Sequence, residues 1–86
     1  MQPVKIEEEL QNYICKQFIP GKSPKKPHID DDLIEEGILD SLAVVNLISY
    51  LEEAYRIEVE PGEVVVDNIG SIRKLTKFIE QKQGRP

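Results

Sequence analysis

The sequence is poor in the residues that most often carry chemistry: among 86 residues it has no tryptophan, one histidine and one cysteine. With Cys15 alone, neither an intramolecular disulfide nor a cysteine cluster for zinc can form, which excludes a disulfide-stabilised secreted scaffold. Because His28 is the only histidine and lies in a Pro/Lys-rich loop, a Ser-His-Asp arrangement would depend on one loop residue. The sequence therefore argues against an enzyme, including a hydrolase that uses Ser41.

Long apolar runs and an excess of basic residues are also missing. No run approaches the length of a membrane span, and MQPVKIEEEL has no signal-peptide pattern, so we expect a cytoplasmic protein. Eleven Lys and Arg are outnumbered by sixteen Asp and Glu, giving a net charge of -5. Since a phosphate backbone requires a basic stripe, we expect no nucleic-acid partner.

What the sequence does contain is helical periodicity, in a chain long enough for one small domain. The spacing predicts helices over about 4–18, from residue 41 to about residue 55, and from residue 72 onward, around a core at about 4–80. Asp40 and Ser71 are the expected N-cap residues, which makes Ser41 the first helical residue of its segment. The predicted inward-facing residues are Ile6, Leu10, Tyr13, Ile14 and Phe18; Val44, Leu47, Ile48, Leu51, Ala54 and Tyr55; and Ile72, Leu75, Phe78 and Ile79.

The segments between these helices are less regular. Residues 19–40 form a long loop that includes the proline- and lysine-rich PGKSPKKPH, with one turn of helix expected around 31–36 and ended by Gly37. Residues 56–66, RIEVEPGEVVV, allow either a hairpin or an extended connection followed by a turn or short helix. We favour the second, because Pro-Gly suits a type II turn better than a tight hairpin. The tail at 81–86 should fray.

Two further features have ordinary explanations. The acidic residues at 30–36 do not follow the EF-hand pattern: counted from Asp30, the fifth and sixth positions are Ile34 and Glu35, and counted from Asp32, the third position is Ile34. Cys15, at the edge of an apolar stripe, is expected to be a half-buried small hydrophobe. We therefore expect neither a metal site nor a reactive thiol.

Ser41 allows two interpretations. It is either an ordinary polar residue in a first helical turn or a hydroxyl presented for modification by another enzyme. A phosphate attached to Ser41 would lie at the positive end of the helix dipole, near free backbone N–H groups. The position of Ser41 at the helix start favours a hydroxyl presented for modification, without establishing it.

The pattern around Ser41 resembles the acyl carrier protein family. The similarity rests on Leu33, on EGILDSL at 36–42, on LEEAY at 51–55, and on the spacing to Ile69 and the last helix; it extends from about Leu33 to Ile79. It implies an all-α fold, a small four-helix bundle of the acyl-carrier type with three main helices and one short third helix. Three successive valines favour a third helix of one turn only.

The resemblance also implies a function. Ser41 would carry a 4'-phosphopantetheine arm, added from coenzyme A by a phosphopantetheinyl transferase, and the arm's thiol would hold an acyl or aminoacyl group as a thioester. The chain would be a monomeric carrier without catalytic activity, served by a loading ligase and by downstream transferases or synthases. The implied partner-binding residues are Asp40, Leu42, Val45, Asn46, Ser49, Glu52 and Ile69.

The residues just after Ser41 depart from one branch of the family, and this narrows the expected function. Carriers of fatty acid synthesis are strongly acidic just after the serine, whereas this chain has Ala43, Val45 and Asn46. Docking should therefore depend more on apolar contact than on charge steering, in a dedicated pathway for an unusual lipid, polyketide or aminoacyl unit. GILDSL is similar to the motif of carriers of D-alanine and other amino acids and unlike the G-G-H-S-L of peptide-synthetase carriers. The alternative is an interaction module of the same fold without a prosthetic group.

Overall fold

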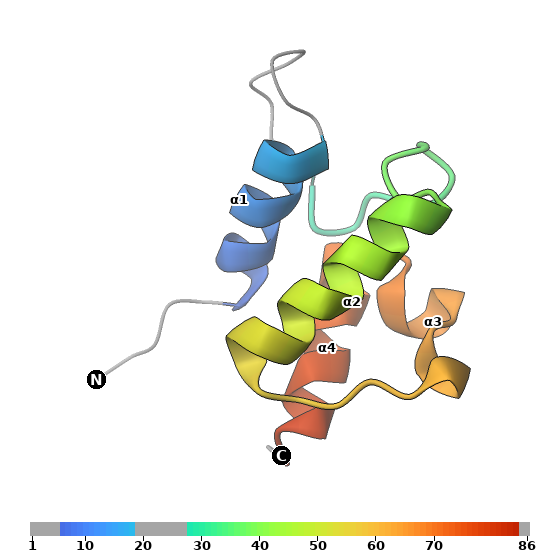
Figure 1. Cartoon of the computed structure of the whole chain (residues 1–86). Helices are drawn as coiled ribbons and strands as arrows, with labels where there is room; N and C mark the ends of the chain where they lie inside the picture. The colour runs from blue at the N-terminus through green and yellow to red at the C-terminus, as the bar shows by residue number, and fades with distance from the viewer. Residues whose placement is uncertain (1–5, 19–27, 85–86) are drawn as a thin grey trace.

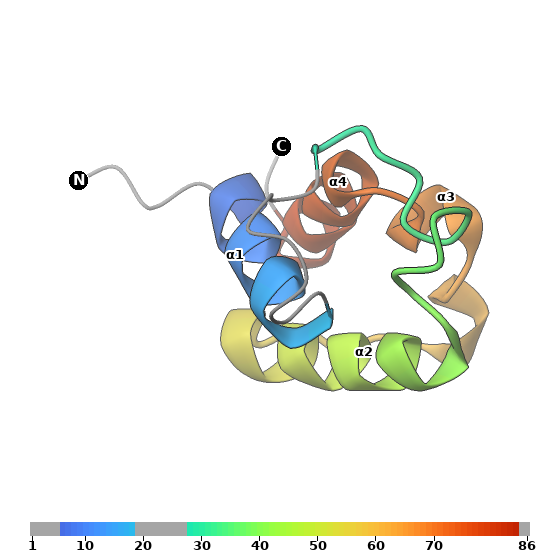
Figure 2. The ribbon, with the colours of Figure 1, turned by 90° about the horizontal axis from the view of Figure 1, so that it is seen from above.

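The structure is a computed structural model that describes residues 6–18 and 28–84. Over these residues it contains four α-helices and no strand: α1 (Ile6–Phe18), α2 (Ser41–Tyr55), α3 (Val66–Ile69) and α4 (Ile72–Lys82), with a 3-10 turn at Pro61–Glu63. In Figure 1 the short α3 lies beside α2. Seen from above, α4 lies opposite α2, with α1 and α3 on the two remaining sides (Figure 2). The predicted all-α bundle with a short third helix is confirmed.

The predicted helical stripes form most of the core. Leu10 and Ile14 of α1 are fully buried, as are Leu47 and Leu51 of α2. Ala54 was expected to face inward but is exposed in the last turn of α2, so that prediction is wrong. The predictions for residues 4 and 5, the Phe18 side chain, the loop at 19–27 and the last two residues lie outside the described part of the chain.

The connection after α2 resolves the ambiguity at 56–66. Arg56 ends α2 in the left-handed region, with φ of 57°. The chain then runs without helix to the 3-10 turn, and Glu52 accepts a hydrogen bond from the Val59 N–H at 3.0 Å. Since no strand forms here, the extended connection with a short helix is confirmed and the hairpin is wrong.

The junction between α3 and α4 is tightly packed. A Cβ atom on Gly70 would lie 2.6 Å from the Val66 carbonyl oxygen, so glycine is the residue that this turn accommodates. Ser71 then caps α4 by accepting the Lys74 N–H at 3.2 Å, as predicted. The predicted inward residues of α4 are all buried: Ile72, Leu75, Phe78 and Ile79.

An aromatic cluster joins α1 to α2. Tyr13 and Tyr50 stack with ring centroids 3.7 Å apart, and Tyr55 meets Tyr50 edge-on at 6.1 Å. The Tyr55 hydroxyl donates a 2.6 Å hydrogen bond to Glu9. Burial, followed by this hydrogen bond, raises the pKa of Tyr55. The three tyrosines pack at the edge of the core, and Cys15 is half-buried, as expected.

A partly buried ion pair holds the 3-10 turn to the end of α4, and it predicts a pH dependence. Lys82 Nζ donates to both Glu63 oxygens, at 3.0 and 3.1 Å. The Glu60 N–H and then Lys82 lower the pKa of Glu63 below its usual 4.5. Because the folded-state pKa is depressed, this stabilisation is present above the usual pKa and is lost as the pH falls through the folded value.

We therefore expect the free energy of unfolding to fall more steeply from about pH 5 to about pH 3 in the wild type than in Glu63→Gln. Urea titrations followed by circular dichroism at each pH would measure this difference. Equal slopes for the two proteins would contradict the assignment. Glu58→Gln, an exposed change in the preceding segment, is the matched control and should keep the wild-type slope.

Candidate functional site

The loop that leads into α2 is organised around Leu33. This side chain is fully buried, and its N–H donates to the Gly70 carbonyl at 2.9 Å. Its own carbonyl accepts the N–H groups of Ile38 and Leu39, both at 3.0 Å. Gly37, with φ of 77°, ends the turn at 33–37, as predicted. The turn of helix expected around 31–36 is wrong, because this segment forms a hydrogen-bonded turn closed on the Leu33 carbonyl and no helix. The chain just before Ser41 is thus fixed to the α3–α4 junction.

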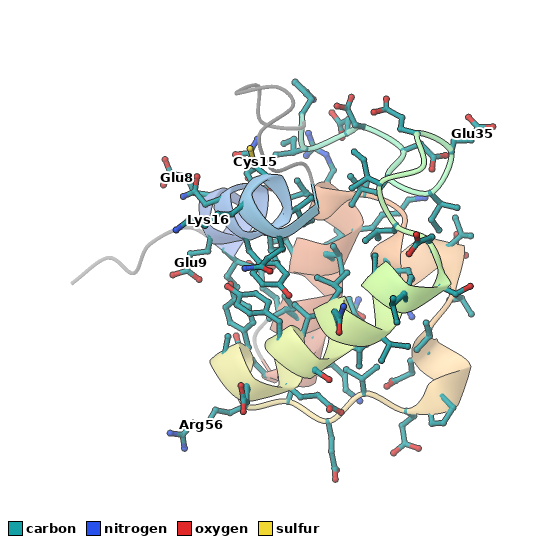
Figure 3. All side chains as sticks on the ribbon, turned by 45° about the horizontal axis from the view of Figure 1, so that its top comes forward. Glu8, Glu9, Cys15, Lys16, Glu35 and Arg56 are labelled. Carbon is teal, nitrogen blue, oxygen red and sulfur yellow. The ribbon has the colours of Figure 1, made fainter. Side chains whose placement is uncertain are left out.

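A second attachment ties the same loop to α4. The Arg73 N–H donates to the Ile29 carbonyl at 2.9 Å, and the Arg73 guanidinium pairs with Asp30 at 2.6 Å. The hydrogen bond from Arg73 lowers the pKa of Asp30. Figure 3 shows Glu35 pointing outward from the loop. Over the described residues no group of three or more His, Cys, Asp or Glu is placed to hold a metal ion.

Ser41 is held at the start of α2 by its neighbour. Asp40 has extended backbone angles, and its Oδ1 accepts the Ala43 N–H at 2.8 Å, so Asp40 is the N-cap, as predicted. Ser41 is the first residue of the helix and is exposed. Since the first N–H groups of a helix have no intrahelical acceptor, those of Ser41 and Leu42 are left at the positive end of the dipole. This geometry fits a phosphodiester on the Ser41 hydroxyl.

A groove with mostly apolar walls, of about 550 Å³, opens beside Ser41 between α2 and α3. Its floor includes Ile69, which is only 3% exposed. We call it the α2–α3 groove; its lining is Ile34, Leu39, Asp40, Ser41, Val44, Val64, Val65, Val66 and Ile69.

The exposed face of α2 next to Ser41 carries no charge in its first turns. Leu42 and Val45 are 71% and 60% exposed, and Asn46 and Ser49 are exposed beside them. Of the other residues expected to bind partners, Asp40 is exposed at the cap. Glu52 is half-buried and bonded to Val59, and Ile69 is buried, so neither shares this open face.

Sequence reasoning missed three apolar residues close to the site. Ile34, Val65 and Val66 are 37%, 45% and 53% exposed and line the α2–α3 groove. The run of three valines was read only as poor helix former. Only Val66 belongs to α3, and Val64 and Val65 precede it; three consecutive apolar residues at a helix start, which cannot all face the core, were the available indication.

Comparison with known proteins decides the family. A family model described as a phosphopantetheine attachment site matches residues 8–79. The chain belongs to this family. It is 34% identical over 77 residues to the D-alanyl carrier protein of Lactococcus lactis subsp. cremoris (strain MG1363), covering 90% of this chain and 95% of that protein. It is 36% identical over 78 residues to the D-alanyl carrier protein of Streptococcus pyogenes serotype M5 (strain Manfredo), covering 91% and 95%.

As a member of this family, the chain is a carrier protein that holds a covalent 4'-phosphopantetheine group and has no catalytic activity of its own. The thiol of that group supplies the thioester chemistry. The protein's contribution is to present an accessible attachment point on a rigid element. None of the helices in the described part of the chain is long and apolar enough to cross a membrane.

Proposed function

We propose that Ser41 is the attachment residue and that the cargo is an aminoacyl group, with D-alanine as the first candidate. The observation that carries the proposal is an exposed serine at the capped start of α2, in a chain similar over nearly its whole length to D-alanyl carrier proteins. Ser23, Ser49 and Ser71 are the other serines. Ser71 is buried as a cap, and Ser49 lies mid-helix, away from free N–H groups.

The roles of the residues at the attachment point follow from their geometry. The Ser41 oxygen is the nucleophile that the transferase directs at the pantetheine-side phosphorus of the coenzyme A pyrophosphate. A new P–O bond to serine forms as the pyrophosphate P–O bond breaks; adenosine 3',5'-bisphosphate leaves, and the serine proton passes to a base of the transferase. Asp40 fixes the helix start through the Ala43 N–H, which keeps the Ser41 oxygen in one place. The N–H groups of the first turn then face the phosphate oxygens.

Partner enzymes dock, in this proposal, on the uncharged face of α2. Leu42 and Val45 supply the exposed apolar contacts, and Asn46 and Ser49 supply hydrogen-bonding groups at their edge. Asp40 bounds the face at the cap. Glu52 supports it from the far end by holding Val59, and Ile69 supports the groove floor. The partners are a phosphopantetheinyl transferase, an ATP-dependent loading ligase and a downstream acyltransferase, with loading in the cytoplasm.

The cargo assignment is tested by competition. The arm-bearing protein would be incubated with ATP, a D-alanine–carrier ligase and equal amounts of D-alanine and L-alanine, each isotopically distinguished. We expect a D-alanyl thioester, released by hydroxylamine, as the main product by intact mass. A parallel reaction with an acyl-carrier synthetase and a long-chain fatty acid should load poorly. Efficient loading by the fatty acid, with none by D-alanine, would reject the aminoacyl proposal.

The same assay tests docking. The few residues that dominate an interface cost more than about 1 kcal/mol when truncated, and Leu42 and Val45 are the exposed apolar candidates for that role. Leu42→Ala and Val45→Ala should therefore each raise the KM of the ligase about five- to tenfold. The kcat should change little. Lys77→Ala, an exposed change on α4, is the control. Because the face is uncharged, added salt should change the wild-type KM less than about threefold; a steep salt dependence would indicate charge steering instead.

A further inference from the structure

A second groove lies on the other side of Ser41, between α1 and α2. It has a volume of about 740 Å³ and, unlike the α2–α3 groove, is lined largely by polar and aromatic side chains. We call it the α1–α2 groove. Its lining is Tyr13, Gln17, Gly37, Ile38, Asp40, Leu42, Ala43, Asn46, Ser49, Tyr50 and Glu53.

The α2 residues of this groove form one continuous face. Leu42, Asn46, Ser49 and Glu53 follow one another at three- and four-residue steps, the spacing of neighbours on a helix surface. The face starts beside Ser41 and reaches Glu53 about 18 Å further along the axis, from the helical rise per residue. The groove thus leads away from the attachment point along α2.

The far end of the groove suits a cation. Glu53 is exposed, and its carboxylate has no hydrogen bond or ion pair within the described part of the chain. Its neighbour Glu52, by contrast, is occupied by the Val59 N–H. The stacked rings of Tyr13 and Tyr50 line the same groove; the two faces between them are covered by the stack, and the outer faces are left to attract an ammonium group. One uncommitted carboxylate and two rings are therefore placed together.

An aminoacyl thioester differs from other acyl thioesters by a free ammonium group, which is costly to place against apolar walls. We propose that, while no partner enzyme is docked on α2, the α1–α2 groove receives the aminoacyl cargo, with Glu53 and the Tyr50 ring facing its ammonium group and Asn46 and Ser49 hydrogen-bonding the amides of the arm. The α2–α3 groove, whose walls include valines, offers mostly apolar contacts and does not hold the ammonium group. This assignment rests on the proposed aminoacyl function and specifies where in the carrier the cargo lies.

The test compares amide spectra of the full chain, labelled with nitrogen-15, in three forms: arm only, arm with propionyl, and arm with D-alanyl. Propionyl has the same carbon skeleton as alanyl and lacks only the ammonium group. We expect the D-alanyl form to shift the amides of Asn46, Ser49, Tyr50 and Glu53 several-fold more than the propionyl form does. The amides of Val65 and Val66, across Ser41, should respond equally to both.

Variants separate this assignment from the proposed function. Glu53→Gln should reduce the alanyl-specific shifts to the propionyl level, whereas Glu58→Gln, outside the groove, should leave them unchanged. Intact mass on the same samples establishes loading. If D-alanine is loaded but the alanyl-specific shifts fall at Val65 and Val66, or are absent, the groove assignment is wrong and the function stands. If no alanyl group is loaded, the function fails and the groove assignment falls with it.

Discussion

Ser41→Ala takes up no phosphopantetheine from coenzyme A and a broad-specificity transferase, while the wild type gains one arm. The expected effect is all-or-none, because the substitution removes the only oxygen through which the phosphodiester can form at this position. The fold should survive. Asp40, not Ser41, caps α2, and Ser41 is exposed, so the change in stability should stay within about 0.5 kcal/mol.

Ser49→Ala is the matched control for this experiment. It removes an exposed hydroxyl from the same helix, two turns further on, and should still gain one arm when the reaction runs to completion, because Ser49 lies on the docking face and not at the attachment point. Circular dichroism would verify that both variants remain helical. An arm on folded Ser41→Ala would show that another residue is the attachment point.

Leu51→Ala lowers the urea midpoint of unfolding far below that of the wild type. Leu51 is fully buried in α2, and truncating a buried leucine to alanine costs about 2–5 kcal/mol in lost burial and in the cavity left behind. A single core in a domain of this size rarely supplies more than about 3–5 kcal/mol in total. The substitution therefore removes most of the available stability.

Urea unfolding followed by helical ellipticity would measure this loss. Val45→Ala is the control, because it also shortens an aliphatic side chain of α2 but at a position that is 60% exposed; its midpoint should barely move. Equal midpoints for Leu51→Ala and wild type would mean that α2 does not supply the core as described.

The parts of the fold that depend on neighbours in sequence could be predicted. Helical spacing identified the buried faces of α1, α2 and α4, and residue types identified Asp40 and Ser71 as caps. The single-turn α3 followed from the poor helix propensity of consecutive valines together with the family resemblance. Each of these depends on interactions within about four residues.

The remaining features depend on partners distant in the chain. The Leu33 hydrogen bond to Gly70 and the Asp30–Arg73 pair join segments 37 and 43 residues apart, and no local pattern predicts which residues meet. The Glu9–Tyr55 bond is another such case. Ala54 has the right spacing for the core and is exposed. Neither groove beside Ser41 was visible from the sequence, since each forms only when two helices are in place.

The most direct test of the account is the intact mass of the wild-type protein through two successive steps. The first step supplies coenzyme A and a transferase; the second adds ATP, D-alanine and a D-alanine–carrier ligase. The account predicts one arm after the first step, located by fragmentation on the peptide containing Ser41, and one alanyl group, labile to hydroxylamine, after the second. A folded wild-type protein that gains no arm would contradict the account and favour an interaction module without a prosthetic group.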